Sequence, residues 1–182
     1  SPLENVAAVS ADDSSLKKAG NADNTENPIP TGQDSRLTLD KLLVAFADVK
    51  HFASPLREYL RVSQHPNFCD IVGFKCSNKG ELESVTLSEP TGTIHFSQLP
   101  REVTRLTLIG GELNQQLDFT DLPFWLHTLV FNKTKFEKSP LKFAKRSGLQ
   151  TFTCVSCGVS KVTTFPPLVK LDLSKNHDLR IA

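Results

Sequence analysis

The 182-residue sequence predicts an α/β solenoid, because one short apolar phrase recurs at nearly constant spacing. The phrase reads Leu-x-x-Leu-x-Leu with minor substitutions, and its first positions, residues 82, 103, 126, 149 and 168, lie 21, 23, 23 and 19 residues apart. Its copies are Leu82/Val85/Leu87, Val103/Leu106/Leu108, Leu126/Leu129/Phe131, Leu149/Phe152/Cys154 and Leu168/Leu171/Leu173. Positions 1, 4 and 6 of each copy are expected to point inward from a short strand.

This phrase and period are those of leucine-rich repeats, whose copies span roughly 20–29 residues. We therefore expect residues 82–182 to form a leucine-rich-repeat solenoid with a short parallel β-sheet on its concave face. Position 9 of such a repeat usually holds an Asn or Cys that turns the chain. Here it reads Pro90, Gly111, Thr134, Cys157 and Asn176, so only the last two fit and the array is divergent.

A second column of aromatic residues supports the same register. Phe96, Phe119, Phe143 and Phe165 lie 23, 24 and 22 residues apart, and predict a stacked spine along the convex side of the core. The register places Cys154 in a strand and Cys157 in the turn after it. This favours structural thiols over a redox pair, because that chemistry needs a helix N-terminus to lower the thiol pKa.

The chain before the repeats divides into two parts. Residues 1–35 are polar and lack aromatic side chains, which predicts a disordered segment because little apolar surface offsets chain entropy. Residues 36–81 are expected to form a helical cap, with Thr38 as an N-cap and Ser54-Pro55 starting a second short helix. The apolar positions of the two helices are Leu39, Leu42, Leu43, Phe46, Val49 and Phe52, then Leu56, Tyr59 and Leu60.

A cysteine-bounded segment, Cys69-Asp-Ile-Val-Gly73-Phe74-Lys-Cys76, leads directly into the first repeat. A helical pair followed by this segment and the repeats resembles the N-terminal cap of extracellular plant-type leucine-rich-repeat proteins. The same cap occurs in leucine-rich surface antigens of trypanosomatid parasites. The resemblance covers residues 38–180 and implies a secreted or surface protein whose cap is closed by a Cys69–Cys76 disulfide.

Physical chemistry supports this disulfide beside the resemblance. A secreted repeat stack must close its first edge, and closing a loop of about eight residues contributes roughly 2.5 kcal/mol on the chain-entropy model. Two alternatives stay open: a reduced pair in a cytosolic protein, and a zinc site. The zinc site is the weaker, because no second Cys/His pair lies at ligand spacing from Cys69 and Cys76.

The register also defines the concave face, which we take as the candidate ligand surface. Position 5 holds Thr86, Thr107, Val130, Thr153 and Asp172; position 3 holds Ser84, Arg105, Thr128, Thr151 and Lys170; position 2 holds Glu83, Thr104, His127, Gln150 and Val169. The candidate ligand-binding residues are Arg105, Thr107, His127, Thr128, Val130, Thr151, Thr153, Lys170 and Asp172. Asn132-Lys133-Thr134 is a glycosylation sequon at position 7, and a glycan on Asn132 would compete with a broad concave site.

Composition and motifs narrow the function to binding. A net charge of +1 provides no field for nucleic acid, and no apolar run approaches the ~18–20 residues of a membrane span. No phosphate loop, nucleophile elbow or metal-ligand spacing appears, so we expect no catalysis, metal or cofactor. We expect an extracellular or cell-surface domain that binds a protein, peptide or glycan. The alternatives are a structural spacer or antigenic shield, and an intracellular scaffold with free thiols.

Both ends of the chain carry expectations of their own. The sequence contains no Met, so Ser1 is not expected to be a native translational start; a removed signal peptide or trimming would account for it. The fifth repeat reaches Ile181-Ala182 without a polar cap, which predicts truncation or further repeats.

Overall fold

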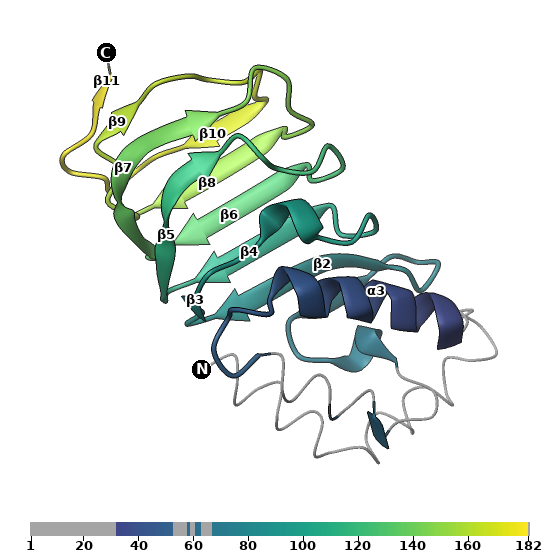
Figure 1. The fold of residues 1–182 in the computed structure, drawn as a ribbon. Helices are drawn as coiled ribbons and strands as arrows, with labels where there is room; N and C mark the ends of the chain where they lie inside the picture. The colour runs from purple at the N-terminus through teal and green to yellow at the C-terminus, as the bar shows by residue number, and fades with distance from the viewer. Residues whose placement is uncertain (1–31, 53–57, 59–60, 63–66, 182) are drawn as a thin grey trace.

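The protein is a parallel β-solenoid in a computed structural model that describes residues 32–52, 58, 61–62 and 67–181 (Figure 1). The sheet expected on the concave face has the order β1-β2-β4-β6-β8-β10 and is called the concave sheet below; the second sheet, with the order β11-β9-β7-β5-β3, is called the convex sheet. The concave strands are β1 (Phe74–Cys76), β2 (Leu82–Ser88), β4 (Arg105–Ile109), β6 (Thr128–Asn132), β8 (Thr151–Val155) and β10 (Lys170–Asp172). The convex strands are β3 (Thr91–Gly92), β5 (Glu112–Phe119), β7 (Lys135–Phe143), β9 (Lys161–Val162) and β11 (Arg180–Ile181).

The predicted repeat register is confirmed by strand pairing. Position 4 runs across the concave sheet as Val85, Leu106, Leu129, Phe152 and Leu171, each paired with the next. Positions 1, 4 and 6 of the first four repeats are all buried, as a strand with one face on the core requires. The fifth repeat differs, since Leu171 is 40% exposed.

One residue of each repeat turns the chain in the left-handed conformation. Position 8 is Glu89, Gly110, Lys133, Ser156 and Lys175, with φ of 55°, 70°, 61°, 55° and 59°. The N–H at this position donates to the position-7 carbonyl of the next repeat, as from Glu89 to Ile109 at 2.7 Å and from Lys133 to Val155 at 2.8 Å. Four side chains other than glycine therefore hold a strained backbone at the same point of each turn.

The convex side of the core is formed by strands, with the aromatic spine beneath them. Phe96, Phe119 and Phe143 are buried, and the ring centroids of Phe119 lie 5.7 Å and 6.1 Å from those of Phe96 and Phe143. The prediction is wrong for Phe165, which is 48% exposed. Phe152 takes its place, with its ring centroid 4.9 Å from that of Phe143. A strand residue of the concave sheet thus completes the spine.

Helix α3 (Gly32–Ala45) packs against the short 3-10 helix η2 (Phe96–Gln98), at the end of the solenoid opposite β10 and β11 (Figure 1). Its predicted apolar stripe is confirmed, because Leu39, Leu42, Leu43 and Phe46 are buried. Thr38 as an N-cap is wrong, because the helix begins at Gly32 and Thr38 is a buried interior residue. The helix therefore starts before the expected 35/36 boundary.

Two predictions concern residues that the structure does not describe. Residues 1–31, most of the predicted N-terminal segment, lie outside the described residues, as do Leu56, Tyr59 and Leu60 of the second helix.

The N-terminal edge of each sheet is covered. On the concave sheet, β1 pairs antiparallel with β2. On the convex sheet, Val49 forms a bridge with Gly92, while Lys50 N–H donates to the Thr91 carbonyl at 2.9 Å and Thr93 N–H to the Asp48 carbonyl at 3.1 Å. The outward edges of β2 and β3, the first strands of the solenoid in the two sheets, are thereby paired at this end of the core.

Candidate functional site

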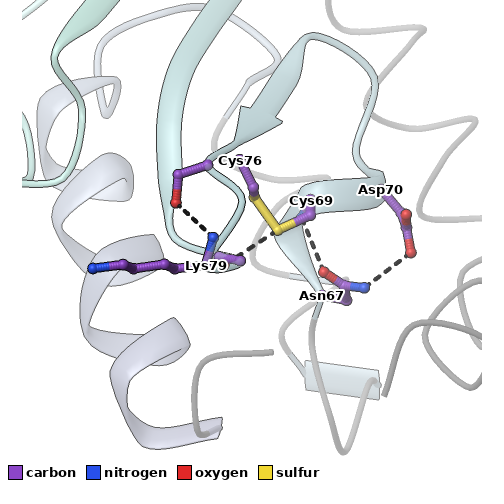
Figure 2. Close-up of a disulfide and its surroundings, with 7 residues drawn as sticks. Asn67, Cys69, Asp70, Cys76 and Lys79 are labelled. Carbon is purple, nitrogen blue, oxygen red and sulfur yellow. Dashed lines mark hydrogen bonds between the residues drawn. A yellow bond between two sulfur atoms is a disulfide. The ribbon is translucent and has the colours of Figure 1, made fainter. Parts of the chain in front are cut away.

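Two cysteines, Cys69 and Cys76, join the cap segment that begins at Asn67 to strand β1 (Figure 2). Cys69 lies in the short 3-10 helix η1 (Phe68–Asp70), Cys76 ends β1, and their sulfur atoms are at bonding distance with the Cα atoms 5.5 Å apart. Buried Asn67 holds the start of η1: its side-chain oxygen accepts from Cys69 N–H at 3.1 Å and its amide donates to Asp70 at 3.0 Å. The cysteine pair expected from the resemblance is thus brought together.

Gly73 lets the cap approach the first repeat closely. Its φ is +88°, and its carbonyl accepts from Thr86 N–H at 2.7 Å. A Cβ at this position would collide with the Thr86 backbone oxygen. Only glycine therefore permits this contact between the cap segment and β2.

The other two cysteines are free and buried, as predicted for structural thiols. Cys154 lies in β8, where burial, followed by the neighbouring Cys157, raises the pKa of its thiol far above the ordinary value. The Cys157 sulfur lies 3.7 Å from the Phe131 carbonyl oxygen and 3.5 Å from the Val155 carbonyl oxygen, and its single S–H can donate to either. A thiol held protonated in the core is a poor nucleophile, so this pair belongs to the packing.

The predicted concave columns form continuous rows across the sheet. Position 3 pairs Arg105 with Thr128, Thr151 and Lys170 in succession, and position 5 pairs Thr107 with Val130, Thr153 and Asp172. Arg105 and Lys170 are exposed, and the other side chains in these two rows are half-buried. The nine candidate ligand-binding residues thus lie together on β4, β6, β8 and β10 or, for His127, directly before β6.

The first strand contributes less to this face than expected. Ser84 of β2 is only 8% exposed, because β1 covers the edge beside it with Lys75 paired to Ser84. The accessible part of the position-3 row therefore begins at β4, whereas Thr86 of β2 is half-buried like Thr107 in the position-5 row.

Position 2 forms an exposed margin beside these rows. The position-2 carbonyls of Thr104, His127 and Gln150 each accept from two N–H groups of the following repeat: the His127 carbonyl accepts from Gln150 N–H at 2.8 Å and from Thr151 N–H at 3.0 Å. This shared acceptor interrupts the strict alternation of the strand, so His127, Gln150 and Val169 all lie exposed.

The Asp172 side chain, at the end of β10, is held by a hydrogen bond from the turn that follows it. Its carboxylate accepts from Ser174 N–H at 2.9 Å, and this bond, with a smaller contribution from Lys170, lowers the carboxyl pKa. Asp172 therefore stays ionised and carries a negative charge two residues from Lys170.

Position 7 adds a third row, in which the sequence motif singles out only Asn132. This side chain is exposed at the end of β6, between Ile109 and Val155. Ile109 is 45% exposed, so an apolar residue lies beside the sequon. Because alternate residues of a strand lie on the same face, position 7 can be placed beside positions 3 and 5 from the sequence alone.

The chain has no match among family models, curated proteins or solved structures. Within the described residues, no helix has the length and apolar character to cross a membrane. The same part of the chain contains no cluster of three or more His, Cys, Asp or Glu side chains that could hold a metal ion.

Proposed function

We propose that this chain is a leucine-rich-repeat recognition domain of a secreted or surface-displayed protein, and that it binds a protein, peptide or glycan through its concave sheet without catalysing a reaction. The observation that carries the proposal is the set of paired rows at positions 3 and 5, which present polar side chains and one apolar residue, Val130, over four neighbouring strands. Strands about 4.8 Å apart make these rows roughly 14 Å across. That width suits an extended peptide or a short glycan.

The leucine-rich identity rests on the turn chemistry as well as on the apolar phrase. Asn176 at position 9 is buried, accepts from Cys157 N–H at 3.0 Å and Val159 N–H at 2.9 Å, and donates to the Cys154 carbonyl at 2.7 Å. An asparagine that joins the turns of neighbouring repeats is what position 9 of a leucine-rich repeat requires. Together with the closed N-terminal edges, it supports likeness to the capped extracellular class.

The extracellular location is supported by the cysteines, of which one pair is within bonding distance and the other two are free and buried. A bridge between Cys69 and Cys76 persists in oxidising compartments, whereas Cys154 and Cys157 are shielded in the core. The exposed Asn132 sequon agrees with passage through the secretory pathway.

The test compares two triple variants in a screen against extracellular proteins and glycan arrays. Arg105→Ala/His127→Ala/Thr128→Ala removes side chains from the concave face. The control, Asn114→Ala/Gln116→Ala/Lys142→Ala, removes three exposed side chains from β5 and β7 of the convex sheet. We expect the concave variant to lose at least tenfold in affinity for a ligand found with the unmodified chain, and the control to lose less than twofold. Equal affinities for all three chains would refute the placement.

The structural spacer or antigenic shield is favoured by the shortage of anchoring aromatic side chains on the concave rows. Saturable binding of the isolated domain to any ligand in the screen argues against it. The intracellular scaffold is tested by intact mass with and without reductant after thiols are trapped at cell lysis. A gain of about two mass units on reduction indicates one bridge and excludes the scaffold.

A further inference from the structure

Thr134 carries a hydroxyl that the fold does not use. It occupies position 9 of the third repeat, its side chain is fully buried, and among the described residues its hydroxyl has no hydrogen-bond partner. A buried hydroxyl without a partner lowers stability, whereas a valine in the same space would not carry that cost. The hydroxyl therefore points to a role outside the packing of the core.

The hydroxyl completes an acceptor motif for N-glycosylation, Asn132-Lys133-Thr134. The motif requires a hydroxyl two residues after the asparagine, so the transferring enzyme must reach both side chains at once. In the folded chain Asn132 is exposed at the end of β6, whereas Thr134 lies in the core. Lys133, with a φ of 61°, turns the chain between them. Folding thus separates the two side chains that an acceptor must present together.

This turn is fixed by main-chain hydrogen bonds to both neighbouring repeats. The Asn132 carbonyl accepts from Gly110 N–H of the second repeat at 2.7 Å. Lys133 N–H donates to the Val155 carbonyl of the fourth repeat at 2.8 Å. Bringing the Thr134 hydroxyl to the surface would break such bonds on both sides, so the folded solenoid withholds it from an enzyme.

The surface around Asn132 can receive a glycan. Asn132 is paired with Ile109 on one side and with Val155 on the other. Ile109 is 45% exposed and Val155 is half-buried, so a sugar attached to Asn132 would cover apolar surface. The glycan would lie at the carboxyl ends of β4, β6 and β8, and it would leave the position-3 row at their amino ends open.

We propose that Asn132 receives an N-linked glycan only before the third repeat folds, and that folding then closes the site to the enzyme. The donor is an oligosaccharide on a lipid diphosphate. The Asn132 side-chain nitrogen forms a bond to the anomeric carbon of the sugar, the bond from that carbon to the phosphate oxygen breaks, one amide proton is lost, and the lipid diphosphate leaves. The proposal rests on the secretory location of the proposed function and adds the order of modification and folding.

Two preparations of the 182-residue chain separate modification during synthesis from modification after folding. One is secreted from eukaryotic cells behind a signal peptide. The other is made in bacteria, folded, and then incubated with purified oligosaccharyltransferase and its lipid-linked donor. Intact mass and peptide mapping measure the glycan on Asn132. We expect more than half of the secreted molecules to be modified, and the folded bacterial chain to be modified at least tenfold more slowly than an unfolded variant.

Leu106→Asp/Phe152→Asp provides that unfolded variant, because it places carboxylates at two fully buried positions and leaves the motif unchanged. Circular dichroism establishes that it is unfolded, and adding Thr134→Val to it should abolish transfer. The matched control in the folded chain is Asp118→Asn, which creates a second motif with Thr120. Positions 118 and 120 are both exposed, so we expect the enzyme to modify this folded variant at the new site.

Three results would each overturn the proposal. The first is equal rates of transfer to Asn132 in the folded and unfolded chains. The second is a secreted chain without a glycan on Asn132. The third is a folded Asp118→Asn chain that the enzyme also refuses, because the burial of Thr134 would then not be what prevents transfer. The transfer assay uses purified components and no ligand, so its failure is distinguished from a failed ligand screen, which would refute the proposed function alone.

Discussion

Asn176 provides the sharpest energetic test of how neighbouring repeats are joined. Its side-chain oxygen is the acceptor for two main-chain N–H groups of the preceding turn, those of Cys157 and Val159. Its amide donates to the carbonyls of Cys154, Leu173 and Ser174 at 2.7, 2.8 and 3.1 Å. Asn176→Ala removes all five contacts from a side chain that is 9% exposed.

The loss of unfolding free energy expected for Asn176→Ala follows from the two N–H groups, those of Cys157 and Val159, that it leaves without an acceptor. A buried donor left unsatisfied costs about 1–3 kcal/mol. Asn176 lies in the last described turn, where water can reach part of the vacated space, so we take the lower half of that range for each donor. With about 1–2 kcal/mol for each of the two donors, the free energy of unfolding should therefore fall by about 2–4 kcal/mol.

Urea unfolding followed by circular dichroism measures this loss. Asn114→Ala, which removes an exposed asparagine from β5, should change stability by less than about 0.5 kcal/mol. Asn176→Asp keeps the oxygen that accepts from Cys157 and Val159, but it replaces the amide donor with a carboxylate oxygen that faces the Cys154 carbonyl. Because two acceptors then face each other, this variant should also lower the free energy of unfolding at neutral pH. If Asn176→Ala costs no more than the Asn114 control, the asparagine does not join the repeats as described.

Three further predictions concern other single positions. Thr134→Val should raise the free energy of unfolding by about 1 kcal/mol in unglycosylated chain, because the buried Thr134 hydroxyl has no hydrogen-bond partner among the described residues; a loss in urea unfolding would show that the hydroxyl is bonded. Lys175→Gly should raise the free energy of unfolding by about 0.5–1 kcal/mol, because glycine adopts a φ of 59° without strain, whereas Gly110→Ala should lower it by about 1 kcal/mol. Changes of the opposite sign in urea unfolding would contradict the left-handed turn conformation. Iodoacetamide should leave Cys154 and Cys157 unmodified in the folded chain and alkylate both after unfolding, as read by intact mass; rapid alkylation in the folded state would contradict their burial.

The sequence was sufficient to predict the concave register. Only one register of the strand places the apolar residues at positions 1, 4 and 6 in the core. A register shift of one residue would expose side chains such as Leu106 and Leu129. The rows that contain Arg105 and Thr107 therefore followed directly from the phrase. The buried roles of Cys154 and Cys157 followed from the same alignment.

The convex side and the turns could not be predicted in the same way. β7 has an irregular register with β5 and contains Pro140, so no clean alternation marks it as a strand. The left-handed position 8 is filled by Glu89, Lys133 and Ser156, none of which signals that conformation as Gly110 does. These features arise from contacts between repeats about twenty residues apart.

Two errors have local physical causes. Thr38 resembles an N-cap because the apolar stripe starts at Leu39, but its side chain is buried on the inner face of a helix that began six residues earlier. Phe165 keeps the aromatic spacing but precedes two prolines outside any strand, and Phe152 occupies the space beside Phe143. Spacing alone does not distinguish a ring that packs from one that does not.

The central claim, that the concave face is the recognition surface, is tested most directly by threonine-methyl NMR on the chain titrated with a ligand from the screen. The concave rows hold Thr107, Thr128, Thr151 and Thr153, while Thr163 lies on the convex side, so the methyl signals report on both faces. Recognition through the concave face should shift the signals of the concave threonines and leave Thr163 unchanged. Shifts confined to Thr163 and its convex neighbours, with the concave signals unmoved, would contradict it.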